Sequence, residues 1–195
     1  MEVTSQSLLI RLQGSNEDKD WNQFDGLYRP LIRSWLFQHG ESADADIDDL
    51  TQVVMLAVTQ SLKSFEHNQR IGAFRAWLKS IVINRLQDFW RSRHRRATLG
   101  KIVDWDFLVQ WADPNSELSS IWDREYERHI LRRATETIES SFEPKTFQAF
   151  RLQMVEGLSA AETAETLGLT RTAVLIAKSR VLKRLREEAA GLIEN

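Results

Sequence analysis

The sequence predicts an all-α protein of two small helical domains, an N-terminal helical bundle and a C-terminal helix-turn-helix domain, joined by a linker. Its 195 residues suffice for one domain or two small ones. Only eight Gly and three Pro interrupt the chain, and apolar residues recur every three or four positions, without the alternation typical of strands. We expect the domains at residues 1–96 and 135–195, with a connection and a linker helix over 97–134.

Three amphipathic segments predict the N-terminal bundle: residues 21–40, 46–65 and 72–95. Each places apolar side chains along one face of a helix. In chain order, the apolar positions are Phe24, Leu27, Leu31, Trp35 and Leu36; Leu50, Val53, Val54, Ala57, Val58 and Leu62; and Phe74, Trp77, Leu78, Ile81, Val82, Leu86 and Phe89. We expect these faces to form one core.

The linker helix and the C-terminal domain carry capping signals. Asp113 and Pro114 predict the N-cap and first turn of the linker helix, and Pro144 predicts another helix start. Ser159 can cap a short helix and Gly168 can adopt the positive φ that ends it. Thr170 can cap the next helix. Two short amphipathic helices joined in this way are typical of a helix-turn-helix.

Charge is unevenly distributed along the chain, although 26 Lys and Arg against 28 Asp and Glu give a net charge of −2. Residues 41–49 hold five acids and no base, residues 70–101 hold nine bases and one acid, and residues 171–186 hold six bases and no acid. This pattern predicts a polyanion bound at two places and a basic partner at a third.

Each basic element has two interpretations. The helix after Thr170 can lie in the major groove of DNA with its Lys and Arg side chains on phosphates. It can also be one helix of a hairpin with a solvated basic face. Residues 84–96 interleave Phe89 and Trp90 with arginines, so they can track a backbone and stack unpaired bases. Alternatively, both rings belong to the core and the arginines complement the C-terminal end of the helix dipole.

Composition and spacing argue against other classes of protein. The absence of Cys excludes disulfides and thiolate metal sites and predicts a cytoplasmic location. The N-terminus lacks the pattern of a signal peptide, and the longest apolar run, residues 53–58, is too short to span a bilayer, so no membrane insertion is expected.

Metal and catalytic motifs are not found. Asp44, Asp46 and Asp48 alternate as in a calcium loop, but Asp49 and Met55 stand where Gly and Glu are needed. The four His lack zinc-site spacing, and there is no Gly-rich phosphate loop. We expect no catalytic residue, no metal, no cofactor and no enzyme activity.

Four stretches, taken in order, resemble the extracytoplasmic-function (ECF) sigma factors, the small promoter-recognition subunits of bacterial RNA polymerase. They are DIDDLTQVVMLAV (46–58), FRAWLKSIVINRLQDFWRSRHRR (74–96), FEPKTFQAFRLQMVEGLSAAETAETLG (142–168) and KSRVLKRLRE (178–187). The resemblance implies a factor that binds core RNA polymerase, directs it to a promoter and helps to melt the minus-ten region. Many members are held inactive by an anti-sigma factor, which adds such a protein to the candidate partners.

The resemblance also implies roles by position. In this family the acidic helix docks on the coiled coil of the β′ clamp. The corresponding core-polymerase-binding residues here are Asp46, Asp48, Asp49, Leu50, Gln52 and Val53. The third helix reads the minus-ten element, and the helix-turn-helix reads the minus-thirty-five element and leans on the β flap. The corresponding DNA-binding residues are Asn84, Arg85, Asp88, Phe89, Arg91, Arg93, Arg95 and Arg96, and then Arg171, Thr172, Ser179, Arg180 and Lys183. The loop 67–72 is expected to hold a flipped base.

Two stretches depart from the family pattern. Leu175 and Ile176 stand where members carry small or polar residues, so they either contact thymine methyls or face another protein or domain surface. The connection 102–112 is apolar at eight of eleven positions, unlike a solvated linker. It either threads toward the polymerase cleft, as in the family, or packs on a flanking domain through Trp105, Phe107 and Trp111.

Two other classes of function remain to be distinguished. An autonomous helix-turn-helix regulator with an N-terminal interaction domain would explain the last fifty or so residues, and it would bind duplex DNA without polymerase. It would leave the acidic segment and the basic-aromatic segment unexplained. A protein-interaction module would bind no nucleic acid.

Overall fold

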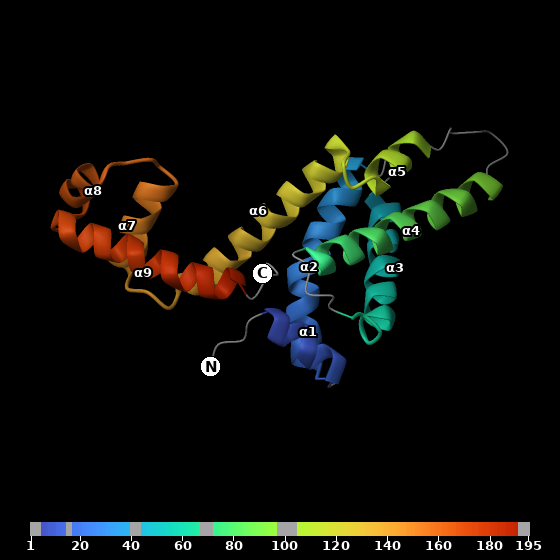
Figure 1. Cartoon of the computed structure of the whole chain (residues 1–195), viewed down its shortest axis with the longest axis horizontal. Helices are drawn as coiled ribbons and strands as arrows, with labels where there is room; N and C mark the ends of the chain where they lie inside the picture. Colours follow the sequence, from blue (N-terminus) through green and yellow to red (C-terminus); the bar gives the residue numbers. More distant parts are fainter. Residues whose placement is uncertain (1–4, 15–16, 40–43, 67–71, 97–104, 191–195) are drawn as a thin grey trace. The chain divides into compact units, whose positions relative to one another are not determined.

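The computed structural model describes residues 5–14, 17–39, 44–66, 72–96 and 105–190 (Figure 1). Within these ranges the chain forms nine α-helices and no strand, which confirms the predicted all-α class. Packing divides the chain into two compact units, Gln6–His129 and Ile130–Leu192, apart from a few residues at the chain ends. The division into functional domains at 1–96, 97–134 and 135–195 stays a prediction.

The first unit contains five complete helices and the start of a sixth. They are α1 (Ser5–Gly14), α2 (Asp18–His39), α3 (Asp44–Leu62), α4 (Ala73–Arg96), α5 (Trp105–Ala112) and α6 (Glu117–Glu139), whose second half belongs to the other unit. α3 packs against both α2 and α4, and the three predicted helices of the bundle differ from the observed ones only at their ends.

The core of this unit follows the predicted apolar stripes with one clear exception. Phe24, Trp35, Val54 and Leu78 are at most 1% exposed. Val53, expected on the buried face of its helix, is 48% exposed, because it lies at the edge of the stripe, where α3 borders a groove beside α4. The stripe is therefore narrower than the sequence predicted.

Polar side chains fasten α1 to its neighbours, a role that the sequence did not reveal. Arg11 donates hydrogen bonds of 2.9 and 2.6 Å to the carboxylate of Asp20, which is buried, and this guanidinium lowers the pKa of that carboxyl group. The amide of Gln13 donates to the carbonyl oxygens of Leu62 (3.0 Å) and Phe65 (2.6 Å). The first carbonyl belongs to the last residue of α3 and also accepts from the Phe65 N–H (3.1 Å), and the second lies three residues further on, so Gln13 fastens α1 to the turn that ends α3.

A cluster of tryptophans joins α2, α5 and α6. The ring of Trp111 lies 5.1 Å from that of Trp35 and 5.6 Å from that of Trp122, centroid to centroid, and all three side chains are at most 1% exposed. Phe107 lies 5.8 Å from Trp111. Packing of the connection through Phe107 and Trp111 is thus confirmed, whereas the side chain of Trp105 and residues 97–104 lie outside the described residues.

The start of the linker helix differs from the prediction. Asp113 and Pro114 were expected to begin it, but α6 begins at Glu117. The carboxylate of Asp113 instead accepts a hydrogen bond from the Asn115 N–H (2.9 Å) within the preceding turn. Ser116 acts as the cap because its hydroxyl accepts from the Ser119 N–H (3.0 Å).

α6 is tied to α2 at a weak point of the latter. Pro30 lies inside α2, where it removes one N–H donor and crowds the preceding turn. A ring nitrogen of the buried His129 lies 2.6 Å from the carbonyl oxygen of Leu27, one residue beyond the carbonyl that Pro30 leaves unpaired. α6 therefore contributes a polar contact to this turn as well as apolar packing.

The second unit contains the end of α6 with α7 (Pro144–Met154), α8 (Ala160–Leu167) and α9 (Arg171–Ala190), coloured orange to red in Figure 1. α9 packs against both α7 and α8. The predicted signals here are confirmed: Pro144 occupies the first turn of α7, Ser159 caps α8, and Gly168 ends it with φ 63° and ψ 41°. The hydroxyl of Thr170 accepts from the Ala173 N–H at 3.1 Å and caps α9.

Candidate nucleic-acid and partner interfaces

The acidic face of α3, defined here as Asp46, Asp48, Asp49, Gln52 and Val53, lies on the accessible side of the helix. Asp48, Asp49 and Gln52 are exposed, and Asp46 is partly exposed. Leu50, which was grouped with them as a binding residue, is only 3% exposed. Five of the six predicted residues therefore form one surface, and Leu50 supports it from beneath.

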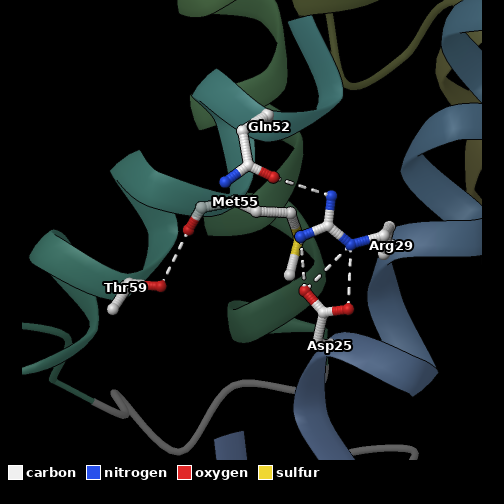
Figure 2. Close-up of polar contacts among 5 residues, drawn as sticks. All are labelled: Asp25, Arg29, Gln52, Met55 and Thr59. Carbon is white, nitrogen blue, oxygen red and sulfur yellow. Dashed lines mark hydrogen bonds and ion pairs between the residues drawn. The ribbon is translucent and has the colours of Figure 1, made fainter. Parts of the chain in front are cut away.

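Two arginines of α2 border this acidic face and were missed by the sequence reasoning. Arg33 lies 2.7 Å from the carboxylate of Asp48. Arg29 donates to the Gln52 side-chain oxygen (3.0 Å) and holds Asp25 through bonds of 2.6 to 2.9 Å (Figure 2). The Asp25–Arg29 pair raises the pKa of Arg29. The spacing of four between Asp25 and Arg29 was a usable signal, but the contacts with α3 depend on tertiary packing.

A groove of about 420 Å³ brings the acidic helix and the basic-aromatic helix together. Its lining from α3 and α4 includes Asp49, Leu50, Val53, Arg85, Asp88 and Phe89. Leu56 also lines the groove and is 54% exposed. The groove thus combines an apolar floor with charged groups of both signs, and it unites residues that the sequence assigned to two different partners.

The DNA-binding residues predicted on α4 form a partly self-neutralised surface. The carboxylate of Asp88 lies 3.1 Å from Arg85 and 4.0 Å from Arg91, and all three side chains are substantially exposed. Asn84 is exposed and Phe89 is half-buried at the groove. The side chains of Arg93, Arg95 and Arg96, and residues 67–71 of the loop, lie outside the described residues.

Phe89 and Trp90, the aromatic residues of the basic segment of α4, fit different interpretations of this segment. Phe89 is partly exposed along the groove, where a ligand can reach its ring. Trp90 is also half-buried, but its ring lies 6.2 Å from that of Phe107 on α5. Trp90 therefore contributes to the attachment of the connection, and Phe89 is the better candidate for stacking on a base.

The predicted DNA-binding residues of the second unit share the outer face of α9. Arg171, Thr172, Ser179, Arg180 and Lys183 are all exposed, while the opposite face buries Val174, Ala177, Val181 and Leu185. Lys183 forms a long ion pair of 3.9 Å with Glu187. Cations and hydroxyls thus point outward from a capped helix in a helix-turn-helix, as contact with a duplex requires.

In the described part of the chain, no three His, Cys, Asp or Glu side chains are grouped so as to hold a metal ion. Nor does any helix there have the length and apolarity to cross a membrane. The accessible chemistry of these surfaces includes charged groups, hydroxyl groups, side-chain amides and apolar side chains. An exposed acidic face, a basic-aromatic helix and a helix-turn-helix on an all-α frame are typical of a DNA-binding transcription factor that also engages a protein partner.

Comparisons with known proteins place the chain more narrowly. The family described as Sigma-70 region 2 matches residues 26–96. ECF RNA polymerase sigma factor SigD of Mycobacterium tuberculosis is 32% identical over 155 residues, covering 77% of this chain and 68% of the relative. ECF RNA polymerase sigma factor SigF of Caulobacter vibrioides is 29% identical over 157 residues, covering 80% and 78%.

A chain of the solved RsbN–BldN complex aligns over 91% of this chain and 96% of its own length, with 19% identity and a TM-score of 0.37. The sequence relationships show the family: this chain belongs to the ECF RNA polymerase sigma factors. It therefore binds core RNA polymerase and directs promoter recognition and transcription initiation. Sigma factors are initiation factors rather than enzymes.

Proposed function

We propose that three surfaces of this chain divide the work of a sigma factor, and that the acidic face of α3 docks on the coiled coil of the β′ clamp. The observation that carries this assignment is the presence of exposed carboxylates beside exposed apolar side chains. Asp48 and Asp49 are exposed, and Val53 and Leu56 are 48% and 54% exposed. Carboxylates speed the capture of a basic helical partner, and desolvated apolar groups then hold it.

The basic-aromatic surface of α4 opens and reads the minus-ten element. Arg85 and Arg91 would track phosphates, Asn84 and Asp88 would offer hydrogen bonds to bases, and Phe89 would stack on an unpaired base. Support for this comes from the partial exposure of Phe89 at the groove and the exposure of Asn84 and Arg91. Arg93, Arg95 and Arg96 extend the same basic segment, and the loop 67–72 would hold a flipped base.

The outer face of α9 reads the minus-thirty-five element through Arg171, Thr172, Ser179, Arg180 and Lys183, and its unit contacts the β flap. An anti-sigma factor is a further proposed partner, as for many members of the family. The chain acts in the cytoplasm, without a cofactor or a catalytic residue, and it is not an enzyme. An autonomous helix-turn-helix regulator is less well supported, because the chain belongs to the sigma factors and carries an exposed acidic face on α3 that such a regulator would leave unexplained.

Charge reversal on α3 tests the docking assignment. Asp48→Lys combined with Asp49→Lys is expected to weaken binding of the full-length chain to core polymerase by about tenfold or more, because like charges would then face the basic partner. The fold should survive, since Asp49 is exposed and the Asp48–Arg33 pair is an exposed salt bridge, a type worth about 0 to 1 kcal/mol.

The control is a second adjacent pair of acids in the same unit. Glu17→Lys combined with Asp18→Lys makes the same change of charge at exposed positions, and it should leave core binding within about twofold of the wild-type value, because these acids lie outside the acidic face. Affinity is measured by titrating labelled chain with core polymerase at fixed salt. Equal affinities for the two double variants would refute docking through Asp48 and Asp49.

A further inference from the structure

The outer face of α9 carries two large apolar side chains that the hydrophobic core does not use. Leu175 and Ile176 are each 51% exposed, whereas their neighbours Val174 and Ala177 are buried. At 3.6 residues per turn, Leu175 and Ile176 flank the line through Thr172 and Ser179 on the side away from the core. They therefore lie in the middle of the predicted DNA-binding surface.

The surroundings of these two side chains are cationic and polar. Arg171, Arg180 and Lys183 are exposed on the same helix, and no acid lies between residues 171 and 186. A protein that covered Leu175 and Ile176 would have to bury or neutralise these cations as well, at a cost in desolvation. The phosphates on both sides of a DNA groove match this arrangement of an apolar centre with a basic border.

Their position along the helix also matters. The hydroxyl of Thr170 caps α9 through the Ala173 N–H, so Leu175 and Ile176 lie within its first two turns. In a helix-turn-helix, this end of the second helix contacts base edges in the major groove. The apolar group that bases present there is the C5-methyl of thymine, and side chains without hydrogen-bonding groups can read it by contact.

We propose that Leu175 and Ile176 are specificity determinants of the second unit, each packing on a thymine methyl in the major groove of the minus-thirty-five element. This inference rests on the proposed role of α9 in DNA binding and adds the base that it prefers. Arg171, Arg180 and Lys183 then supply phosphate contacts on either side. Sequence preference at these positions comes from methyl contact instead of the hydrogen bonds expected at such sites.

Exchange of thymidine for deoxyuridine tests the proposal, because it removes only the methyl group. Duplexes are selected from a randomised pool with the full-length chain bound to core polymerase. Each thymidine of the selected upstream element is then replaced in turn, and affinities are compared by competition. One or two positions should lose about fourfold in affinity, the expected effect of one buried methyl. Leu175→Ala should abolish the loss of affinity at the thymidine that Leu175 contacts, and Ile176→Ala should abolish it at the thymidine that Ile176 contacts.

A matched control is Leu131→Ala in the same unit, since Leu131 is 45% exposed but lies on α6. It should keep the full methyl dependence, and thermal unfolding checks that all three variants are folded. Affinity that is indifferent to deoxyuridine, or methyl dependence that survives both α9 variants, overturns the inference and leaves DNA binding by α9 intact. Failure of the pool to yield any upstream element overturns the proposed role of α9 and the inference with it.

Discussion

Removal of the Trp111 side chain measures how firmly the connection is built into the first unit. Trp111 is fully buried, with its ring 5.1 Å from Trp35, 5.6 Å from Trp122 and 5.8 Å from Phe107. A buried Trp→Ala change costs about 3 to 5 kcal/mol of unfolding free energy. With a urea m-value of about 2 kcal/mol per molar, the midpoint should fall by roughly 2 M.

Two further substitutions isolate the cause of this loss. The indole N–H of Trp111 is buried without a hydrogen-bond partner in the described part of the chain. Trp111→Phe therefore keeps a ring and removes an unsatisfied donor, so it should cost less than about 1.5 kcal/mol. Val109→Ala on the same helix should change stability by no more than about 0.5 kcal/mol, because Val109 is 68% exposed.

The assay is urea unfolding followed by far-UV circular dichroism. Hydrogen exchange of α2 and α4 amides identifies the transition of the first unit, since two units can unfold separately. If Trp111→Ala unfolded at the same urea concentration as Val109→Ala, the tryptophan cluster would not stabilise the unit. The connection would then have to be treated as a solvated linker.

Two further predictions concern charge. The Glu162 carboxylate accepts from the Ser159 N–H (2.8 Å) and completes a capping box at the start of α8. Hydrogen bonds from Ser159 lower the pKa of Glu162, so this capping contribution is present above the unfolded pKa of about 4.5 and is lost as the pH falls through the lower folded value. Glu162→Gln should therefore flatten the acid-side fall in melting temperature of the second unit, and an unchanged slope would contradict the assignment. Replacing Arg91, Arg93, Arg95 and Arg96 with Ala should reduce the slope of log binding constant against log salt concentration, for promoter DNA, by about 0.9 per lost phosphate contact. An unaltered slope would mean that these arginines only solvate the end of the helix.

The sequence was most informative where structure depends on residues near in the chain. Ser159, Gly168 and Thr170 were placed correctly because a cap needs only a hydroxyl or a positive φ at one position and a helix beside it. The error at Asp113 has the same local origin. Asp113 followed by Pro114 is a sound N-cap signal, but Ser116, three residues later, offers a second cap, and that one begins the helix.

Contacts between distant helices were beyond this kind of reasoning. Arg33 and Asp48 are fifteen residues apart, and His129 meets the carbonyl of Leu27 across 102 positions. No periodic pattern contains such pairs, because they depend on how α2, α3 and α6 pack. The candidate surfaces were therefore predicted as sets of residues, while the ion pair between Arg33 and Asp48 and the hydrogen bond from Arg29 to Gln52 emerged only in three dimensions.

Asp88 gives the basic helix an internal competitor. Its carboxylate already occupies the space between Arg85 and Arg91, so an arriving phosphate gains only the difference between its own attraction and the one it displaces. Under the proposed role of α4 in minus-ten binding, this competition would weaken its attraction for nucleic acid in general. A base that donates a hydrogen bond to Asp88 would recover the difference, so one acidic residue among arginines would favour strands that offer such a base.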